Sequence, residues 1–511
     1  MAEMIKLFVN GNEVEVEAGK NLIDAIGAVG IEIPHLCYHP ALGADGNCRM
    51  CLVGLEEGGP PLVAACKTPA AEGMKVLLDA DHIKKIQHDV LEFQLINHPV
   101  DCPVCDQAGE CSLQDYYMTY DGQKSRMTVP QVTKSKKMDF GCGVIHDQER
   151  CVLCGRCVRF CRQITKTGEL GIVNRTDTAR VAIFPGRPLD NRYAVNVVDL
   201  CPVGAMTSAD FRFKQRVWFM KKERGVCHGC SKGCNITIDH NREKDQDDLI
   251  YRFRPLFNEQ INGYFICDEG RLSYRDENEN RLTEARLSKT TMSLDKAVTA
   301  GLKEIKRAEG IVILISPDCS LEQMVSVKSL AEELGATLSG FSDGYIKKGD
   351  GDDYLIQDDK AANRAGLAAL NIDSSQTGFE EALAKAGLLI NFNNDLSLFY
   401  DESSLKKLFK EKRVIGVTSR NTKLFQMANL VIPVASFTEY SGSIISCDNI
   451  LQTFNRAITK NDTLVDICEV ASLFGGPLKT DRDRYDELKK IVVSLNDFDP
   501  DTIPATGLKL T

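Results

Sequence analysis

Alternating apolar and polar positions begin the chain and predict its first elements. Residues 4–17, MIKLFVNGNEVEVE, alternate on both sides of an Asn-Gly pair, which is the strongest short signal for a β-hairpin. Residues 21–30, NLIDAIGAVG, follow with a helical pattern that has Asn at its start and Gly at its end. We therefore expect a hairpin, a helix and a cysteine-bearing loop to form a small β-grasp-like domain that ends near residue 80.

An amphipathic pattern marks the next segment, residues 81–97. Its apolar residues recur at helical spacing, at Ile83, Ile86, Val90, Leu91 and Leu95. The predicted helix leads directly into a stretch with three cysteines, HPVDCPVCDQAGEC (98–111). Residues 121–140 are polar and predict a connector, and two more cysteine-rich segments follow at about 141–217 and 220–275.

The hydrophobic pattern changes after about residue 290. An amphipathic stretch, SLDKAVTAGLKEIKRA, is followed by the buried-strand pattern GIVILIS, and the runs KAGLLINF and KRVIGVTS repeat that strand pattern further on. Between them, SLEQMVSVKSLAEELGA predicts a helix with a capping box of Ser320 and Gln323 and a stop at Gly335. Strands that alternate with helices predict a parallel α/β sheet.

The composition is typical of a globular protein with several domains. Of the 511 residues, 43% are hydrophobic and 26% are charged, which is enough for sizeable cores in three or four domains. A net charge of −10 without a Lys/Arg-dense face excludes a general nucleic-acid binder. The apolar runs are too short to cross a bilayer, and residues 1–16 lack the apolar region of a secretory signal peptide. We therefore expect membrane association only through partners.

The cysteines change this picture most. There are 20, and without a signal peptide they argue against a disulfide framework. Seventeen of them lie between Cys37 and Cys267, and only Cys319, Cys447 and Cys468 lie beyond. The first half of the chain is therefore predicted to bind metal.

The first cysteine set is Cys37, Cys48, Cys51 and Cys66. Three ligands around a glycine-containing loop with a distant fourth is the arrangement in which a β-grasp ferredoxin holds a [2Fe–2S] cluster. The first gap of ten residues is longer than the plant-type gap of four. Buried structural cysteines are the alternative, but they do not account for four cysteines in this order.

The third set is Cys151, Cys154, Cys157 and the Cys201-Pro202 pair. A C-x2-C-x2-C turn lets three thiolates converge on three corners of a [4Fe–4S] cube, and a remote cysteine before proline supplies the fourth, as in bacterial ferredoxins. Cys161 occupies the position that would serve a second cube in those ferredoxins. The partner triad for such a cube is missing, so we interpret Cys161 as a buried thiol and not a ligand.

The fourth set is Cys227, Cys230, Cys234 and Cys267. A four-cysteine zinc site is the main competitor, since such sites also use CxxC pairs. The second gap of three residues is unlike a simple zinc knuckle, so we favour a [4Fe–4S] cluster.

The second set, Cys102, Cys105 and Cys111, is one ligand short. Cys142 is the nearest unused cysteine downstream, but it lies beyond the polar connector. His98 lies four residues before Cys102, and neutral imidazole is a competent iron ligand, as in Rieske centres. We therefore predict His98 as the fourth ligand of a [4Fe–4S] cluster, against the alternative of a solvated histidine at a helix end. This leaves five cysteines in structural roles: Cys142, Cys161, Cys319, Cys447 and Cys468.

The ordered motifs resemble those of the large iron–sulfur subunit of respiratory complex I, the proton-pumping NADH–quinone oxidoreductase, over nearly the whole chain. The segments that carry the resemblance are CYHPALGADGNCRMCLV, HPVDCPVCDQAGECSLQD, CVLCGRCVRFC and CPVGAM. In this family one cluster has one histidine and three cysteine ligands, which implies His98 as an iron ligand. The fourth set resembles an additional cluster of some bacterial members, thought to lie off the main electron path. CHGC with CDEGR, and Ala428–Ile458, resemble molybdopterin oxidoreductases.

The resemblance implies a multidomain α/β chain with one [2Fe–2S] and three [4Fe–4S] clusters and no molybdenum. Its expected divisions are a [2Fe–2S] ferredoxin-type β-grasp domain (1–80), a His-and-Cys-ligated [4Fe–4S] domain (81–120), a ferredoxin-like [4Fe–4S] segment (121–218), a molybdopterin-oxidoreductase-type [4Fe–4S] domain (219–276) and a truncated, Rossmann-like α/β domain (277–511).

The resemblance further implies an electron wire without a complete active site of its own. Clusters carry single electrons, and no G-x-G-x-x-G follows a strand, so no dinucleotide site is visible. The implied route runs from an NADH-oxidising flavin subunit and its [2Fe–2S] companion, past the Cys151 cube and the His98 cube, to a ferredoxin-like [4Fe–4S] subunit and the quinone module. The implied location is peripheral, on the cytoplasmic side of a bacterial inner membrane.

Four further classes stay as alternatives. The diaphorase subunit of a NAD-linked hydrogenase should end soon after the third set, whereas a formate dehydrogenase chain should be much longer and supply a metal ligand in a full pterin domain. An iron-only hydrogenase needs more cysteines in its second half. A zinc-rich scaffold predicts colourless protein with tetrahedral zinc.

Overall fold

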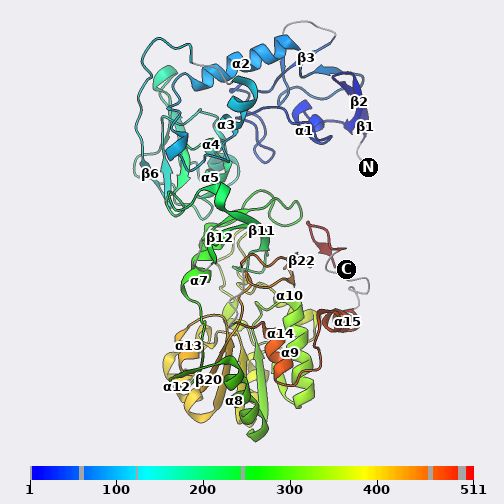
Figure 1. Ribbon diagram of the computed structural model, residues 1–511. Helices are drawn as coiled ribbons and strands as arrows, with labels where there is room; N and C mark the ends of the chain where they lie inside the picture. Colours follow the sequence, from blue (N-terminus) through cyan, green and yellow to red (C-terminus); the bar gives the residue numbers. More distant parts are fainter. Residues whose placement is uncertain are drawn as a thin grey trace. The chain divides into compact units, whose positions relative to one another are not determined.

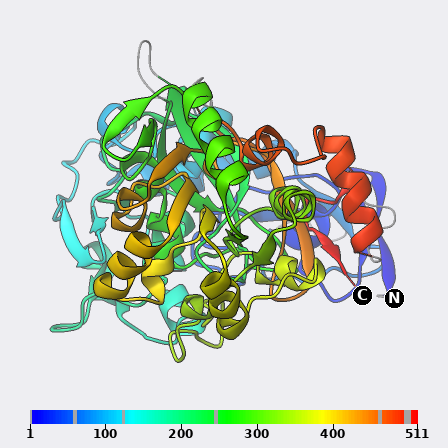
Figure 2. The same cartoon turned by 90° about the horizontal axis from the view of Figure 1, so that it is seen from below.

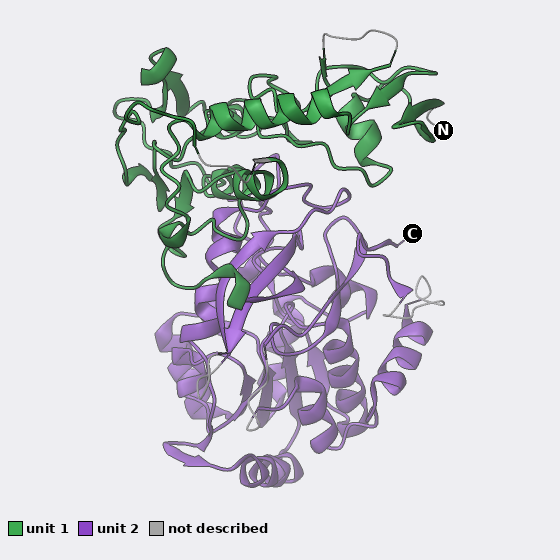
Figure 3. Ribbon diagram, turned by 45° about the horizontal axis from the view of Figure 1, so that its top comes forward, with its two compact units in different colours: residues 1–219 green, residues 220–511 purple. Residues whose placement is uncertain are grey.

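The computed structural model describes residues 3–56, 62–121, 125–242, 248–458, 464–492 and 502–510. It divides the chain into two compact units, residues 1–219 and 220–511 (Figure 3). In the ranges just given, no helix is both long and apolar enough to cross a membrane.

The first unit begins with the predicted hairpin, strands β1 (Met4–Val9) and β2 (Asn12–Glu17) in antiparallel pairing (Figure 1). Asn10 and Gly11 between them both have positive φ, 49° and 82°, as a two-residue hairpin turn with right-handed twist requires. The pair belongs to a five-stranded sheet of order β2-β1-β5-β3-β4. Its other strands are β3 (Leu52–Leu55), β4 (Val63–Ala64) and β5 (Lys75–Leu77).

Helix α1 (Leu22–Gly27) packs Leu22, Ile23 and Ile26 into the core of this sheet. It begins after Asn21, as predicted, but it ends at Gly27, three residues before Gly30, where φ is positive (83°). Helix α2 (Asp81–Leu95) confirms the predicted amphipathic helix, and it buries Ile83 and Leu91. Residues 125–137 contain no helix or strand, in agreement with the predicted connector.

The rest of the first unit consists of short elements separated by long loops. The helices are α3 (Ser112–Tyr116), α4 (Arg156–Gln163) and α5 (Asn196–Leu200). The strands are β6 (Met138–Gly141), β7 (Val144–His146) and β10 (Met206–Ser208) in one sheet of order β10-β7-β6, and β8 (Leu170–Val173) with β9 (Arg180–Ile183) in another. The cysteines of the second and third sets lie in or beside these loops and short helices.

The second unit begins with an antiparallel sheet of three strands, β11 (Lys221–Val226), β12 (Asn235–Arg242) and β13 (Asp248–Pro255). Two short helices follow it, α6 (Asp268–Leu272) and α7 (Tyr274–Glu279). The third sheet of the unit has the order β21-β22-β23 and consists of β21 (Gly442–Ile445), β22 (Ile450–Phe454) and β23 (Leu508–Lys509).

Along the chain, the residues between β13 and β21 form a seven-stranded sheet of order β15-β14-β20-β19-β18-β16-β17. Its strands are β14 (Ala285–Leu287), β15 (Thr290–Met292), β16 (Ile311–Ile315), β17 (Thr337–Ser339), β18 (Leu388–Phe392), β19 (Arg413–Thr418) and β20 (Leu430–Pro433). The five strands β16 to β20 are parallel, as predicted, whereas β14 and β15 form an antiparallel edge. When the five parallel strands are numbered along the chain, their order across the sheet is 2-1-3-4-5, which is the flavodoxin-like doubly wound order.

Helices cover both faces of this sheet (Figure 1 and Figure 2). Successive residues of β16 show the alternation, since Ile313 packs into the core with α8, α9 and α14, and Leu314 into the core with α11, α12 and α13. The predicted capping box of Ser320 and Gln323 is present at the start of α9. The helices are α8 (Leu294–Arg307), α9 (Leu321–Leu334), α10 (Arg364–Ala369), α11 (Gln376–Lys385), α12 (Glu402–Glu411), α13 (Lys423–Gln426), α14 (Ile467–Leu473) and α15 (Asp481–Ile491).

Candidate metal centres

The first cysteine set lies at the edge of the five-stranded sheet, and all four thiols are buried. The Cys37 N–H donates to Cys48 Sγ over 3.4 Å. Hydrogen bonds from the Cys48 and Cys66 thiols lower the pKa of Cys37, so these three sulfurs lie close together. Cys51 also contacts Cys66, whose thiol lowers the pKa of Cys51 to about 7. The structure thus brings together the four residues that the sequence predicts.

Three members of the second set, His98, Cys102 and Cys111, line a cavity of about 560 Å³ in the first unit. Burial lowers the pKa of His98, which keeps the imidazole neutral and leaves a ring nitrogen available as a ligand. Cys105 belongs to the same loop and is also buried. Cys142, the other candidate for this site, is exposed in the turn between β6 and β7.

The third set joins the start of helix α4 to the loop after helix α5. Cys157 lies in the first turn of α4, and Cys201 follows α5 directly. Burial raises the pKa of Cys151 to about 12 and that of Cys154 to about 11. Thiolates at these positions therefore need a bound cation to stabilise them. Cys161, one turn after Cys157, is completely buried.

The fourth set lies in the second unit, between β11 and β12 and at the start of α6. The Cys227 N–H donates to the carbonyl of Cys234 over 2.8 Å, which closes the loop. Cys267 caps α6, because its Sγ accepts a hydrogen bond from the Gly270 N–H. The loop also packs on β21 and β22, where Asn235 and Gly233 bond to the Gln452 side chain. The Ala428–Ile458 segment singled out in the sequence thus supports this loop.

Left-handed backbone marks all four loops. Each contains a residue of positive φ between two predicted ligands: Arg49 (58°), Val100 (49°), Leu153 (53°) and Gly233 (63°). For the β-branched Val100 this conformation is a clear outlier that has to be stabilised by its surroundings. Alternation of right- and left-handed residues turns successive N–H groups toward one concave side, the arrangement that iron–sulfur and phosphate sites use.

Two glycines test whether a cluster fits the sulfurs. A Cβ on Gly204, three residues after Cys201, would lie 2.1 Å from Cys105 Sγ, and a Cβ on Gly270 would lie 2.9 Å from Cys227 Sγ. At both positions the ligand sulfur therefore fits only because the neighbouring residue is a glycine, without a side chain. A single tetrahedral zinc needs sulfurs only ~3.8 Å apart, given Zn–S bonds of about 2.3 Å. Among the residues that the structure describes, no three sulfurs of a set lie within 4.8 Å of one another. No set in the described ranges therefore presents three sulfurs at zinc spacing, although Cys37 contacts the thiols of both Cys48 and Cys66.

One group of ligand atoms does lie that close, on helix α2. His88, Asp89 and Glu92 place one ligand atom each within 4.8 Å of the others. Sequence analysis did not predict this group. Arg126 forms ion pairs with both of its carboxylates, so a cation already neutralises them.

Hydrogen bonds connect the first and third sets directly. The Asn47 side chain, next to Cys48, donates to the carbonyl of Leu153, next to Cys154, over 3.1 Å. From α4, the buried Arg159 guanidinium donates to the carbonyls of Leu42 and Gly43 and to that of Cys37. Sequence analysis missed Arg159, since its only local signal is a position two residues after Cys157.

Similar contacts connect the third set to the second. The Ser112 N–H, next to Cys111, donates to the carbonyl of Pro202, next to Cys201, over 3.0 Å. Arg150, next to Cys151, forms a two-pronged ion pair with Asp101, next to Cys102. Within the first unit, the third set is therefore in contact with both others through residues adjacent to the ligands.

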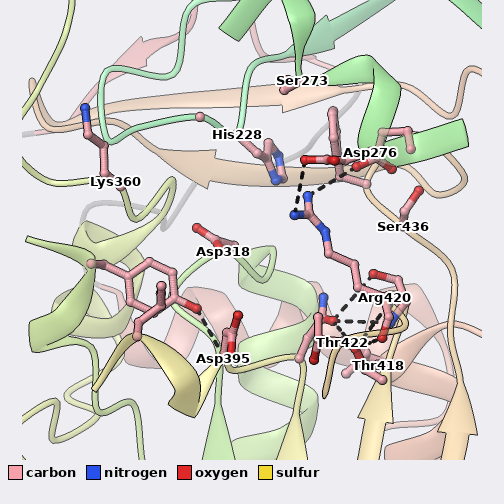
Figure 4. A pocket seen from close by; sticks show the side chains of 18 of the residues that line it. His228, Ser273, Asp276, Asp318, Lys360, Asp395, Thr418, Arg420, Thr422 and Ser436 are labelled. Carbon is pink, nitrogen blue, oxygen red and sulfur yellow. Dashed lines mark hydrogen bonds and ion pairs between the residues drawn. The ribbon is translucent and has the colours of Figure 1, made fainter. Parts of the chain in front are cut away.

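The second unit also contains a cavity of about 460 Å³ at the carboxyl ends of the parallel strands (Figure 4). Asp318 follows β16, Asp395 follows β18 and Arg420 follows β19, and His228 enters from the loop of the fourth set. Arg420 approaches Glu277 at 3.4 Å. Burial raises the pKa of Asp318 to about 6. Sequence analysis did not predict this cavity, because its lining comes from segments far apart in the chain.

Three family models match the first half of the chain. They are the 2Fe-2S iron-sulfur cluster binding domain over residues 2–80, the NADH-ubiquinone oxidoreductase-G iron-sulfur binding region over 87–126, and the ferredoxin-like domain of NADH-quinone oxidoreductase subunit 3 over 141–207. The matched ranges contain the first three ligand sets.

Curated relatives match about two thirds of the chain. The G subunit of NADH-quinone oxidoreductase from Rickettsia conorii is 35% identical over 339 residues, 65% of this chain and 50% of its own. The 75 kDa subunit of NADH-ubiquinone oxidoreductase from Reclinomonas americana is 35% identical over 65% of this chain and 48% of its own. The iron-sulfur protein 1 of mitochondrial NADH dehydrogenase from Solanum tuberosum is 34% identical over 65% and 45%. The chain thus spans about half the length of the curated relatives it matches.

A chain in the crystal structure of NAD+-reducing [NiFe]-hydrogenase in the H2-reduced state aligns with 42% of this chain and 91% of its own, with 24% identity and a TM-score of 0.38.

Proposed function

Because the chain is a homologue of the G, or 75 kDa, subunit of NADH-quinone oxidoreductase, we propose that it is the iron–sulfur electron-transfer subunit of such a complex. It relays electrons from an NADH-oxidising flavin subunit toward quinone. When bound, the clusters supply the single-electron chemistry, and the chain itself supplies ligands, spacing and electrostatics. No catalytic residue is assigned to it.

The proposed ligands are the four sets already described. His98, Cys102, Cys105 and Cys111 hold one [4Fe–4S] cluster, and two further cubes belong to the third and fourth sets. The first set holds the [2Fe–2S] cluster. The iron–sulfur family models over residues 2–80, 87–126 and 141–207 support this assignment over zinc for the first three sets.

The observation that carries the relay is the contact order of the ligand loops within the first unit. The Asn47–Leu153 and Arg159–Cys37 bonds join the first set to the third, and the Ser112–Pro202 bond joins the third to the second. Successive single-electron transfers need neighbouring centres, and loops that contact one another next to their ligands keep the centres close. This order agrees with a route that enters near residues 1–80 and leaves from the His98 site.

The second unit has a different part in the proposal. Its flavodoxin-like strand order and the cluster loop packed on β21 and β22 support a truncated domain of the molybdopterin-oxidoreductase type, without molybdenum. The cube of Cys227, Cys230, Cys234 and Cys267 would lie beside this domain and off the main route. The proposed partners are the flavin subunit with its [2Fe–2S] companion, a ferredoxin-like [4Fe–4S] subunit and the quinone module. The proposed location is peripheral, on the cytoplasmic side of the membrane.

Anaerobic purification, iron and zinc counting and electron paramagnetic resonance (EPR) test this proposal. The expected result is about 14 irons per chain, with one binuclear and three cubane signals after reduction. Zinc in place of iron would refute it. His98→Ala should remove or change one cubane signal and leave the others, and four unchanged signals would exclude His98 as a ligand.

A further inference from the structure

Arg150 is a buried arginine between the second and third ligand sets. Its side chain is only 5% exposed. Nε and Nη2 donate to the Asp101 carboxylate over 3.0 Å and 2.6 Å, and Nε also lies 3.3 Å from Asp147. Among the described residues, its third nitrogen, Nη1, has no hydrogen-bond partner. A guanidinium nitrogen that is both buried and unpaired is costly, unless something else accepts its hydrogen bond.

The unpaired nitrogen belongs to a side chain that borders the His98 site. A Cβ placed on Gly204 would lie 2.1 Å from Cys105 Sγ and 3.7 Å from Arg150 Cδ, so the ligand sulfur and the arginine meet at one glycine. The positive charge therefore lies beside a sulfur of the second set.

Asp101 and Asp147 fix the orientation of Arg150. Because Nε and Nη2 of the planar guanidinium face Asp101, Nη1 lies on the opposite side. Rotation of the guanidinium would break its bonds to the Asp101 carboxylate, which is only 22% exposed. Lys136 completes the group, 3.2 Å from Asp101 and 2.8 Å from Glu149, but its side chain is 45% exposed. Solvent therefore screens the charge of Lys136 much more than that of Arg150.

We propose that Arg150 is a positioning residue for electron transfer, which presents a fixed positive charge and an N–H donor to the Cys105 side of the His98 site and thereby raises the reduction potential of that centre. The inference rests on the proposed ligand set. Reduction adds one negative charge to a site with three thiolates, and a buried cation favours the reduced form. Arg150 thus adds a positive charge beside a centre whose fourth ligand, His98, is neutral.

Potentiometric titration of the full chain, followed by EPR of the His98-dependent cubane signal, tests this. Arg150→Met is combined with Asp101→Asn, so that the Asp101 carboxylate does not keep its charge after it loses the guanidinium. At a potential where half of the wild-type centre is reduced, the double variant should show its reduced-to-oxidised ratio lowered by about tenfold, which is ~59 mV for a one-electron couple. Arg150→Lys, which keeps the charge and loses the fork, should fall between the two.

Lys136→Met is the matched control, since it removes one positive charge from the same group of side chains at an exposed position. Its shift should be clearly smaller than that of the double variant. An equal shift would overturn the inference, because an exposed cation of the same group would then act as strongly as the buried donor. An unchanged midpoint in the double variant would also overturn the inference. The proposed function would remain intact in that case, because the His98-dependent signal would still be present. If His98→Ala changes no cubane signal, the proposed ligand set fails first. If the double variant loses the cluster, Arg150→Lys decides, and a wild-type midpoint in it refutes the role of the fork.

Discussion

Gly204→Ala is a substitution of one methyl group that should remove one cluster. The added Cβ would lie 2.1 Å from Cys105 Sγ and 3.2 Å from the Gln107 Cβ. A relaxed contact between such atoms needs about 3.5–4.0 Å, so the sulfur has to retreat by about 1.5 Å. Metal–ligand distances tolerate only about 0.2 Å, which the required shift exceeds several-fold. Gly204 is not among the residues of positive φ, so the effect is steric and not a backbone effect.

The assay is iron content with EPR of the reduced, anaerobically purified chain. The expected change is from about 14 to about 10 irons, with loss of the His98-dependent cubane signal and retention of the other three. Gly171→Ala is the control, because its Cβ would meet only the Phe184 ring at 3.6 Å or more. A Gly204→Ala chain with full iron and an unchanged His98-dependent signal would refute the reasoning. So would equal losses in both variants.

Three further predictions follow from the sites. His98→Cys should keep a cubane signal that His98→Ala loses, but with a lower midpoint in potentiometric EPR, because a fourth thiolate adds negative charge; an equal or higher midpoint would contradict this. Arg159→Met should leave the carbonyls of Cys37, Leu42 and Gly43 without their buried donor and destabilise this loop by about 2–4 kcal/mol. Iron loss from the binuclear site to a chelator should then be faster. Arg187→Met, at an exposed position, should not change this rate. The pKa of Asp318 is raised from 3.8 to about 6, so its stabilising contribution is complete below pH 3.8 and is lost as the pH rises through 6. Asp318→Asn should therefore increase the free energy of unfolding of the second unit at pH 7.5 by up to about 3 kcal/mol, and should not do so at pH 3.5. Thermal unfolding at the two pH values measures this as a higher midpoint at pH 7.5 alone.

Local patterns in the sequence predict local structure well here. The Asn10-Gly11 hairpin, helix α2 and the Ser320–Gln323 capping box each depend on residues within a few positions of one another, and the structure confirms all three. The cysteine spacings act in the same way, because a C-x2-C turn brings its own sulfurs together. Helix α1 begins after Asn21, as predicted, but it ends at Gly27, before the predicted stop at Gly30.

Contacts across long sequence separations could not be predicted in this way. Arg159 bonds to Cys37, 122 residues earlier, and Arg150 to Asp101, 49 residues earlier. Nothing in either local sequence distinguishes these arginines from exposed neighbours. The cavity of the second unit is harder still, since Asp318, Asp395 and Arg420 follow three different strands and meet only after the sheet forms. The ligands were therefore predictable and the electrostatics around them were not.

The cavity in the second unit also differs from the sites that its strand order suggests. In doubly wound sheets the helix after the first parallel strand often binds phosphate at its N-terminus. Here the helix is α9, and its own Ser320 and Gln323 side chains satisfy the N–H groups of residues 323 and 320. Asp318 lines the cavity two residues before Ser320, so an anion would meet a carboxylate instead of free N–H donors. The strand order is thus that of doubly wound sheets, while the capping box occupies two N–H groups at the helix terminus where such sheets often bind phosphate.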